Sequence, residues 1–384
     1  MKMEIVVPAL AASILINSFM AVVPILAEIQ KSFPEAAVSG IQLLYTISSL
    51  FSLVTMLLAG RLVYYFSKKT LLLVGIGIMF AGGVLPFLFH QSLWMLYILC
   101  AVFGIGMGFN AVISSTLISD HFKGIEKGRI MGIQAAIVSI GGAVMSALTG
   151  FIAAHANWAL SYLVFVICIP IFILVLFILP KDKITLKTEA KGGGINGRLV
   201  CFVTLNFFIS MCINVFNSNN AMFLEKTGLG NAAVAGTVQF IFMIVGIPVG
   251  LKFGSCIKFL GRNIMGIAAL FVTLGMFLTA FSHSLITVYI GSLLIGAGFA
   301  IKCPGGITFS SNMVHENSAA MAIALNNAFG SVGSFISPIF FNTITEKIGG
   351  KLEIQFIISG AISLLLALLY FLIGSIKKEE VKAH

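Results

Sequence analysis

The chain has 384 residues, of which 59% are hydrophobic and only 9% are charged. Soluble globular domains carry about 25% charged residues, so the composition excludes that class and predicts an integral membrane protein. We interpret the formal net charge of +10 as a mark of membrane topology and of attraction to anionic lipid headgroups, not as a sign of nucleic-acid binding.

Apolar runs recur along the whole chain. Crossing a hydrocarbon core about 30 Å thick takes about 20 mostly apolar residues, and twelve such runs can be marked. Each backbone polar group needs a partner inside lipid, so these runs are predicted to be helices. The predicted fold is an all-α membrane protein with twelve transmembrane helices. The runs cover residues 4–27, 38–64, 70–90, 93–118, 130–153, 157–180, 198–223, 232–254, 263–282, 286–312, 318–343 and 353–376.

The distribution of lysine and arginine predicts which side of the membrane each loop faces. With both termini in the cytoplasm, 18 of the 23 basic residues fall on the cytoplasmic side. The other side holds only Lys31, Lys226, Lys347 and Lys351, and Lys302 lies inside a span. This bias follows the positive-inside rule. We therefore expect a multi-pass protein of the cytoplasmic membrane with both termini inside the cell.

One polar segment divides the chain. Residues 180–198, "PKDKITLKTEAKGGGINGR", are rich in lysine and glycine and are predicted to form a long cytoplasmic connection. This placement predicts a six-helix bundle at 1–180, a linker at 181–197 and a second six-helix bundle at 198–384. An internal repeat at an offset of about 193 residues favours the same division. It matches residues 60–69 with 254–263, 103–110 with 295–302, and 139–146 with 331–338.

The loop after the second span carries a family signature. The major facilitator superfamily has Gly-x-Leu-x-Asp-Arg-x-Gly-Arg-Lys there, and the chain resembles it in "GRLVYYFSKK", residues 60–69. Tyr64 and Lys258 stand where the family has an aspartate, and Ser67 replaces a glycine. In the family this loop holds a neighbouring helix end and helps to close the cytoplasmic side. The resemblance implies a gating role for Gly60, Arg61, Lys68, Lys69, Gly254, Gly261 and Arg262.

The resemblance covers essentially the whole chain, and it implies both architecture and activity. Members are secondary transporters whose two pseudo-symmetric halves rock around a site near the bilayer midplane, which gives alternating access. Matching glycines in spans four, five, ten and eleven would let the helices approach closely and move against each other. The implied partners are a small-molecule substrate and the lipid bilayer, with a coupling ion left open.

Lys302 lies inside the tenth predicted span, about 25 Å along a helix that begins at Leu285. An ionised lysine at depth costs about 2.5–3.5 kcal/mol. Its stem of about 6 Å is too short to snorkel across the roughly 15 Å that remain before His315. All thirteen acidic residues fall in loops, tails or span ends. Lys302 is therefore expected to face a cavity and to take its partner from solution, which favours an anionic substrate.

Neutral polar side chains could complete the binding site, in the spans that the resemblance places around the cavity. One of them, Asn110, occupies the position that the internal repeat matches to Lys302. The alternative for each is an ordinary hydrogen bond between helices, worth about 0.6 kcal/mol. The candidates are Asn17, Gln42 or Tyr45, Asn110, Gln134, Asn206, Asn214, Gln239, Asn326 and Asn327.

Proton-coupled efflux of drugs and toxic compounds is the alternative transport function. The efflux branch of the family has an arginine where this chain has Cys100, and a Gly-Pro-x-x-Gly-Gly pattern where it reads "GGAVMS", residues 141–146. Both marks are missing. No carboxylate at membrane depth is available to carry a proton, although a lysine can do so. A sensor with a transporter-like fold also stays open, because fold does not fix function.

An enzyme is not expected. The sequence has no phosphate loop and no set of nucleophile, base and orienting group. Its six cysteines lie in or beside apolar runs and its histidines at loops, span ends or the C-terminus, so no metal and no cofactor are predicted. We expect a monomeric carrier of a small anionic solute, with Lys302 as the partner of the substrate charge.

Overall fold

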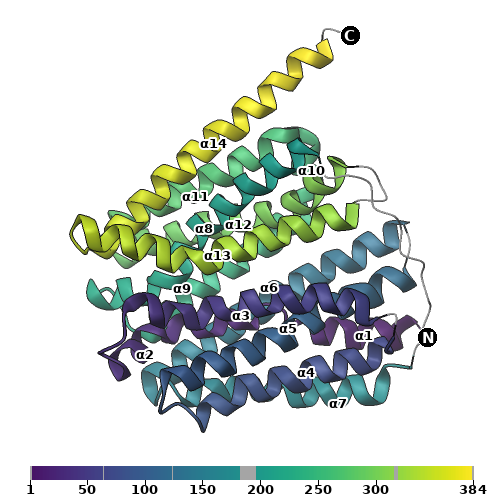
Figure 1. The fold of residues 1–384 in the computed structure, drawn as a ribbon, viewed down its shortest axis with the longest axis horizontal. Coiled ribbons are helices and arrows are strands. Elements are labelled where there is room, and N and C mark those ends of the chain that lie inside the picture. Colours follow the sequence, from purple (N-terminus) through teal and green to yellow (C-terminus); the bar gives the residue numbers. More distant parts are fainter. Residues whose placement is uncertain (1, 64, 123, 182–195, 315–318, 383–384) are drawn as a thin grey trace. The chain divides into compact units, whose positions relative to one another are not determined.

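The computed structural model describes residues 2–63, 65–122, 124–181, 196–314 and 319–382. All regular structure in these ranges is helical (Figure 1). The helices of the first half are α1 (Lys2–Ser13), η1 (Ser18–Ile25), α2 (Leu26–Ser32), α3 (Val38–Leu62), α4 (Lys68–Val84), η2 (Leu85–Phe87), α5 (Leu93–His121), α6 (Gly124–His155), η3 (Leu160–Ile167) and α7 (Cys168–Ile178). Those of the second half are α8 (Gly197–Lys226), α9 (Ala232–Ile244), α10 (Gly246–Leu260), η4 (Gly261–Asn263), α11 (Ile264–Ala280), α12 (Leu285–Asn312), α13 (Ala319–Ile348) and α14 (Leu352–Lys382).

The predicted all-α membrane fold is confirmed. Within the described ranges, eleven helical segments are long and apolar enough to cross a membrane. The ninth predicted span corresponds to α11, which is apolar but has only 17 residues. At 1.5 Å per residue this helix is about 26 Å long, close to the thickness of a hydrocarbon core.

The contacts divide the chain into two compact units. The first unit contains residues 1–189 and 220–240, and the second contains residues 190–219 and 241–384. The end of α8 and most of α9 therefore group with the first six spans. Most of the predicted linker, residues 182–195, lies outside the described residues. The division at 181–197 remains a prediction from the sequence.

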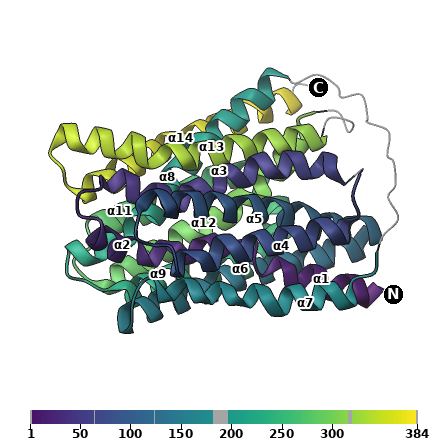
Figure 2. The same ribbon diagram turned by 60° about the horizontal axis from the view of Figure 1, so that its bottom comes forward.

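Helices pair in the same pattern inside each unit. In the first unit α5 packs along α3 and α4, and α4 also packs along α7. In the second unit α12 packs along α10 and α11, and α11 also packs along α14. Spans two, three, four and six thus have the same neighbours as spans eight, nine, ten and twelve. Figures 1 and 2 both show α4 and α5 running side by side. The internal repeat of the sequence is therefore also a repeat of packing.

Glycines allow the closest of these contacts. A Cβ atom added to Gly104 of α5 would lie 2.3 Å from the carbonyl oxygen of Ser48 in α3. A Cβ atom added to Gly296 of α12 would lie 2.3 Å from the carbonyl oxygen of Phe242 in α9. The sequence repeat matches these two glycines to each other. Such contact between backbones is possible only where the side chain is absent, as is common between membrane helices.

Substitution of Gly104 tests this packing. We expect Gly104→Ala to lower the free energy of unfolding by about 1–3 kcal/mol, because α5 and α3 must move apart. The control is Gly77→Ala in α4, where an added Cβ meets nothing within 4 Å and where alanine should be neutral or favourable by up to about 1 kcal/mol. Thermal unfolding of the purified protein in detergent measures both. Equal melting temperatures for the two variants would contradict the prediction.

Candidate functional site

Lys302 lies in α12, half-buried inside the candidate span Leu285–Ser310. Its Nζ atom donates a hydrogen bond of 2.7 Å to the Oγ atom of Ser210 in α8. Among the described residues no carboxylate oxygen lies within 4.0 Å of this ammonium group. Ser310 lies eight positions after Lys302, which is about 12 Å of helix and about twice the length of a lysine stem. The charge is thus held at depth by a neutral hydroxyl group.

Gly330 of α13 lies over this charge. A Cβ atom added to Gly330 would lie 3.3 Å from Ser210 Oγ and 3.5 Å from Lys302 Nζ. Ser210 is buried, and its hydroxyl donates to the carbonyl oxygen of Asn206 at 2.6 Å. We call Ser210, Lys302 and Gly330 the ammonium layer. Three helices therefore meet at one positive charge, and the third packs against it through the backbone of a glycine.

A second polar layer lies one helical turn away. The Nδ2 atom of Asn206 in α8 donates to the Oδ1 atom of Asn326 in α13. A Cβ atom added to Gly306 of α12 would lie 2.9 Å from Asn326 Nδ2 and 3.2 Å from Asn206 Nδ2. Both asparagines are buried, and Asn206 Oδ1 has no hydrogen-bond partner among the described residues. We call Asn206, Gly306 and Asn326 the amide layer.

The two layers are built from the same faces of the same three helices. Each of α8, α12 and α13 contributes one residue to each layer, four positions apart. Residues at this spacing lie above one another on a helix, about 6 Å apart along its axis. The arrangement brings together three residues that the sequence named as candidates, Lys302, Asn206 and Asn326. It offers one positive charge next to a pair of neutral amides.

The other candidates of the second unit lie in different surroundings. Asn214 is buried, and its Nδ2 atom donates to the carbonyl oxygen of Ser334 in α13 at 2.9 Å. Asn327 is exposed and accepts a long hydrogen bond of 3.4 Å from Asn326. Asn214 therefore joins two helices, and Asn327 lies at the edge of the amide layer.

Two candidates of the first unit contact a break in the first span. This span is α-helical in α1, leaves that geometry after Ser13 and continues as the 3₁₀ helix η1. Asn110 Nδ2 donates to the carbonyl oxygen of Ala12 at 2.8 Å, and Gln134 Nε2 donates to Ser13 Oγ at 2.9 Å. A 3₁₀ stretch inside a longer helix is often a hinge. Asn110 and Gln134 thus bind the region where the first span changes its winding.

Tyr45 and Gln239 meet at a sulfur atom of the first unit. The Tyr45 hydroxyl and the Gln239 Nε2 atom both donate to Met20 Sδ, at 3.5 and 3.4 Å. Tyr45 also stacks on Phe19, with ring centroids 5.4 Å apart. The two remaining candidates of the first unit also have polar partners, and they are Gln42, which is buried, and Asn17, which precedes η1.

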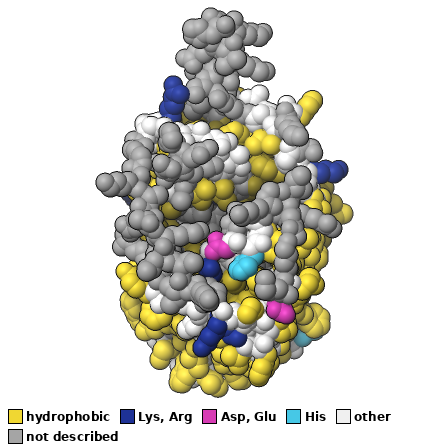
Figure 3. Space-filling model, turned by 90° about the vertical axis from the view of Figure 1, so that its right-hand side faces the viewer, with side chains coloured by type: hydrophobic (Ala, Val, Ile, Leu, Met, Phe, Trp, Pro, Cys, Tyr) yellow, Lys and Arg dark blue, Asp and Glu magenta, His cyan; other side chains and the backbone are white. Residues whose placement is uncertain are grey.

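The predicted gating loop contains an ion pair. Lys68 Nζ lies 3.0 Å from the Oδ2 atom of Asp120 at the end of α5, with the lysine buried and the carboxylate partly exposed. Ser67 caps α4 by accepting a hydrogen bond from the Thr70 amide. Lys68 therefore holds the end of a neighbouring helix within its own unit. Figure 3 shows an end of the molecule where charged side chains lie among hydrophobic ones.

The structure gives fewer contacts for the other predicted gating residues. Gly60 and Gly254 have open space where a Cβ would lie, and Gly261 takes a positive φ of 54° at the end of α10, which favours glycine. Lys69 is half-buried beside Lys68. The side chains of Arg61 and Arg262 lie outside the described residues.

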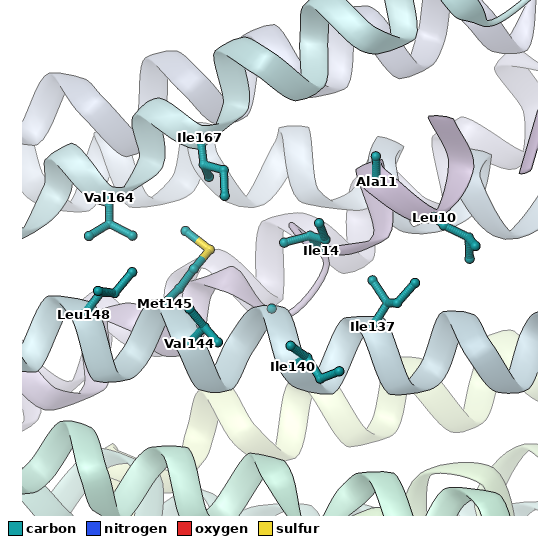
Figure 4. A pocket seen from close by; sticks show the side chains of 11 residues that line it. Leu10, Ala11, Ile14, Ile137, Ile140, Val144, Met145, Leu148, Val164 and Ile167 are labelled. Carbon is teal, nitrogen blue, oxygen red and sulfur yellow. The ribbon is translucent and has the colours of Figure 1, made fainter. Parts of the chain in front are cut away.

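A separate cavity of about 580 Å³ lies in the first unit and is entirely apolar in its side chains. Figure 4 shows the lining residues Ile137, Ile140 and Val144 on α6, with Ile14 beside the break in the first span and Ile167 of η3 on other segments. Several of these side chains are exposed on the surface of the unit. The cavity offers a place for hydrocarbon and carries no group that would bind a charge.

Ser210 is the residue of the site that the sequence did not indicate. Serine is common in membrane helices, and a single one carries little information. The spacing of Asn206, Ser210 and Asn214 at every fourth position of α8 places three polar side chains on one face of a helix. That stripe is the signal that could have identified Ser210.

Replacement of Lys302 tests whether the ammonium group lowers the free energy of unfolding. We expect Lys302→Met to raise the free energy of unfolding by about 1–3 kcal/mol in the absence of ligand, because a poorly partnered charge is removed from membrane depth. Ser210→Ala should lower it by about 1–3 kcal/mol, and by less in the Lys302→Met background. Thermal unfolding of the wild type, the two single variants and the double variant measures this double-mutant cycle. A loss of stability in Lys302→Met would mean that the lysine is structural.

Comparisons with known proteins agree with this architecture. The sequence pattern of the Major Facilitator Superfamily matches residues 8–338 and 199–384. No curated protein matches the chain. Among solved structures, a mutant of the nucleoside transporter NupG has a TM-score of 0.79 and 14% identity over 96% of this chain and 99% of its own.

Two further structures have the same fold. The inward-open xylose transporter XylE from E. coli has a TM-score of 0.77 and 18% identity, covering 95% of this chain and 94% of its own. The POT family transporter PepTSo has a TM-score of 0.78 and 11% identity, covering 98% of both chains. With a family pattern that spans its whole length, the chain belongs to the Major Facilitator Superfamily of membrane transporters.

Proposed function

We propose that this secondary transporter moves a small anionic organic solute by alternating access, with Lys302 as the partner of the substrate charge. Membership of the family and the fold make the chain a secondary transporter of small molecules. The observation that carries the anionic substrate is the hydrogen bond of Lys302 to a single hydroxyl, with no carboxylate of the described residues within reach.

Magnitudes support an anion as the missing partner. An ammonium group at membrane depth costs about 2.5–3.5 kcal/mol, and a hydrogen bond from a charged group returns about 1.5–3 kcal/mol at best. An anion about 4 Å from the ammonium group would add about 4 kcal/mol of attraction at an effective dielectric constant of 20. The charge is therefore favourable when the anion is bound and a cost when it is not, which suits a reversible site.

Alternating access needs contacts that close and release, and each end of the first unit has an ion pair of that kind. Lys68 pairs with Asp120 on the side predicted to be cytoplasmic. On the opposite side Lys31 Nζ lies 2.6 Å from Glu225 Oε1 and 3.1 Å from Glu28 Oε1. The pairs of Lys31 are largely exposed, and such pairs are worth about 0–1 kcal/mol each. Such a small free energy lets a gate open and close.

Efflux of lipophilic compounds is the second candidate, and the apolar cavity beside the first span favours it. A cavity of about 580 Å³ has the size of many small-molecule sites, which are mostly apolar. The cavity lacks the few convergent polar groups that such sites also have. We therefore rank efflux below transport of an anion, and the same experiment separates the two.

A thermal-shift screen tests the anionic substrate. The purified protein is heated with a panel of organic anions and a panel of lipophilic cations. We expect some anions to raise the melting temperature, because a ligand at 100 times its dissociation constant adds about 2.7 kcal/mol to the stability of the folded state. The shift should be lost in Lys302→Gln. It should persist in Lys252→Gln, which removes an exposed positive charge at a span end.

The cation panel decides between the two functions. Stabilisation by lipophilic cations that survives Lys302→Gln but is lost in Val144→Trp, which fills the apolar cavity, would assign the chain to efflux. Anion shifts that survive Lys302→Gln would show that the charge partner lies elsewhere. Either outcome overturns the role proposed for Lys302.

A further inference from the structure

We infer that the substrate carries a single negative charge and, about one helical turn from it, a neutral group that both donates and accepts hydrogen bonds. This inference rests on the proposed function and narrows the class of its substrate. The geometry that carries it is the stacking of the ammonium layer on the amide layer along α8, α12 and α13.

The single charge follows from the count of cations. Of the 23 lysines and arginines, all except Lys302 fall in loops, tails or at the ends of spans. A second acidic group on the substrate would therefore enter the membrane without a partner. An unpaired carboxylate at this depth is as costly as an unpaired ammonium group. The site thus selects monoanions against dicarboxylates and phosphate esters.

The neutral group follows from the amide layer. Asn206 and Asn326 are 1% and 4% exposed, and the buried Oδ1 atom of Asn206 has no hydrogen-bond partner in the part of the chain that the structure describes. A buried acceptor without a donor is costly, and a ligand can supply the missing bond. A hydroxyl or amide on the substrate donates to Asn206 Oδ1 and accepts from an asparagine Nδ2 atom. A purely hydrocarbon tail would leave the acceptor unsatisfied.

The spacing follows from the helices. The residues of the two layers are four positions apart on each helix, which places the layers about 6 Å apart. Gly306 and Gly330 are buried, and an added Cβ would contact the polar atoms of the amide and ammonium layers respectively. Both glycines bring the backbones of α12 and α13 close to these polar atoms, where a larger side chain would not fit. The substrate is therefore an organic acid whose polar group is about 6 Å from its carboxylate.

Three acids of equal chain length test the inference: pentanoate, 5-hydroxypentanoate and glutarate. They differ only at the far carbon, which is a methyl group, a hydroxymethyl group or a second carboxylate. From thermal shifts over a concentration series, we expect 5-hydroxypentanoate to bind about 3- to 10-fold more tightly than pentanoate, the gain of one hydrogen bond. Glutarate should bind more weakly than both.

Variants assign the preference to the two layers. Asn206→Leu, which is nearly isosteric and removes the unsatisfied Oδ1 acceptor, should abolish the advantage of the hydroxyl and leave pentanoate binding unchanged. The control Thr204→Val lies on the same helix, and the Thr204 hydroxyl donates to the Val200 carbonyl, so the preference should persist. Asn326→Lys adds a second cation and should make glutarate the best of the three ligands.

The possible outcomes separate this inference from the proposed function. One outcome is that glutarate or pentanoate binds as tightly as 5-hydroxypentanoate while the thermal shifts still require Lys302. In that case the inference is wrong, and the proposal of an anionic substrate stands. The inference also fails if Asn206→Leu keeps the hydroxyl preference. It fails likewise if other anions bind through Lys302 and none of the three acids does. If the thermal shifts of all binding anions persist in Lys302→Gln, both the inference and the proposed role of Lys302 are overturned.

Discussion

The site depends on one electrostatic constraint, a positive charge held at membrane depth by a hydroxyl group. Lys302 contacts Ser210, and among the described residues no carboxylate neutralises it. Such a charge lowers the stability of the empty protein. We propose that an anion restores the lost stability, so that the same imbalance makes this a binding site. In this proposal the neutral amide pair distinguishes among anions without adding charge.

Close packing of helices supplies the framework for this site. Gly104 and Gly296 bring backbones into contact at matching places in the two units, and the same pairs of spans pack together in each. The halves nevertheless differ in detail. In the first unit the opening span changes from α to 3₁₀ winding and is bound by Asn110 and Gln134, whereas α8, its counterpart, runs unbroken beside Lys302. The repeat thus preserves packing while the polar chemistry lies mainly in the second unit.

The candidate list shows where sequence reasoning is strong. Hydropathy and depth along a helix identify Lys302, because an ionised side chain at membrane depth is costly and therefore rare. The roles of the neutral polar residues are harder to predict from sequence, since an asparagine can line a site or join two helices at similar free energy. Asn206 and Asn326 lie next to the ammonium layer, Asn110 and Gln134 contact the first span, and Asn214 joins α8 to α13. No sequence pattern separates these cases.

The sequence alone determined the membrane class, the helical spans, the internal repeat and the family. Hydropathy, basic-residue bias and glycine spacing are visible in short stretches of sequence, and they respond directly to the bilayer environment. The sequence also determined that one cation would lack an acidic partner. Only the tertiary structure decided which neighbours that cation has. Ser210, Gly330 and the Asn206–Asn326 pair come from helices that are far apart in the chain. Their meeting depends on the crossing of three helices and the rotation of each, which follow from side-chain packing along their whole length.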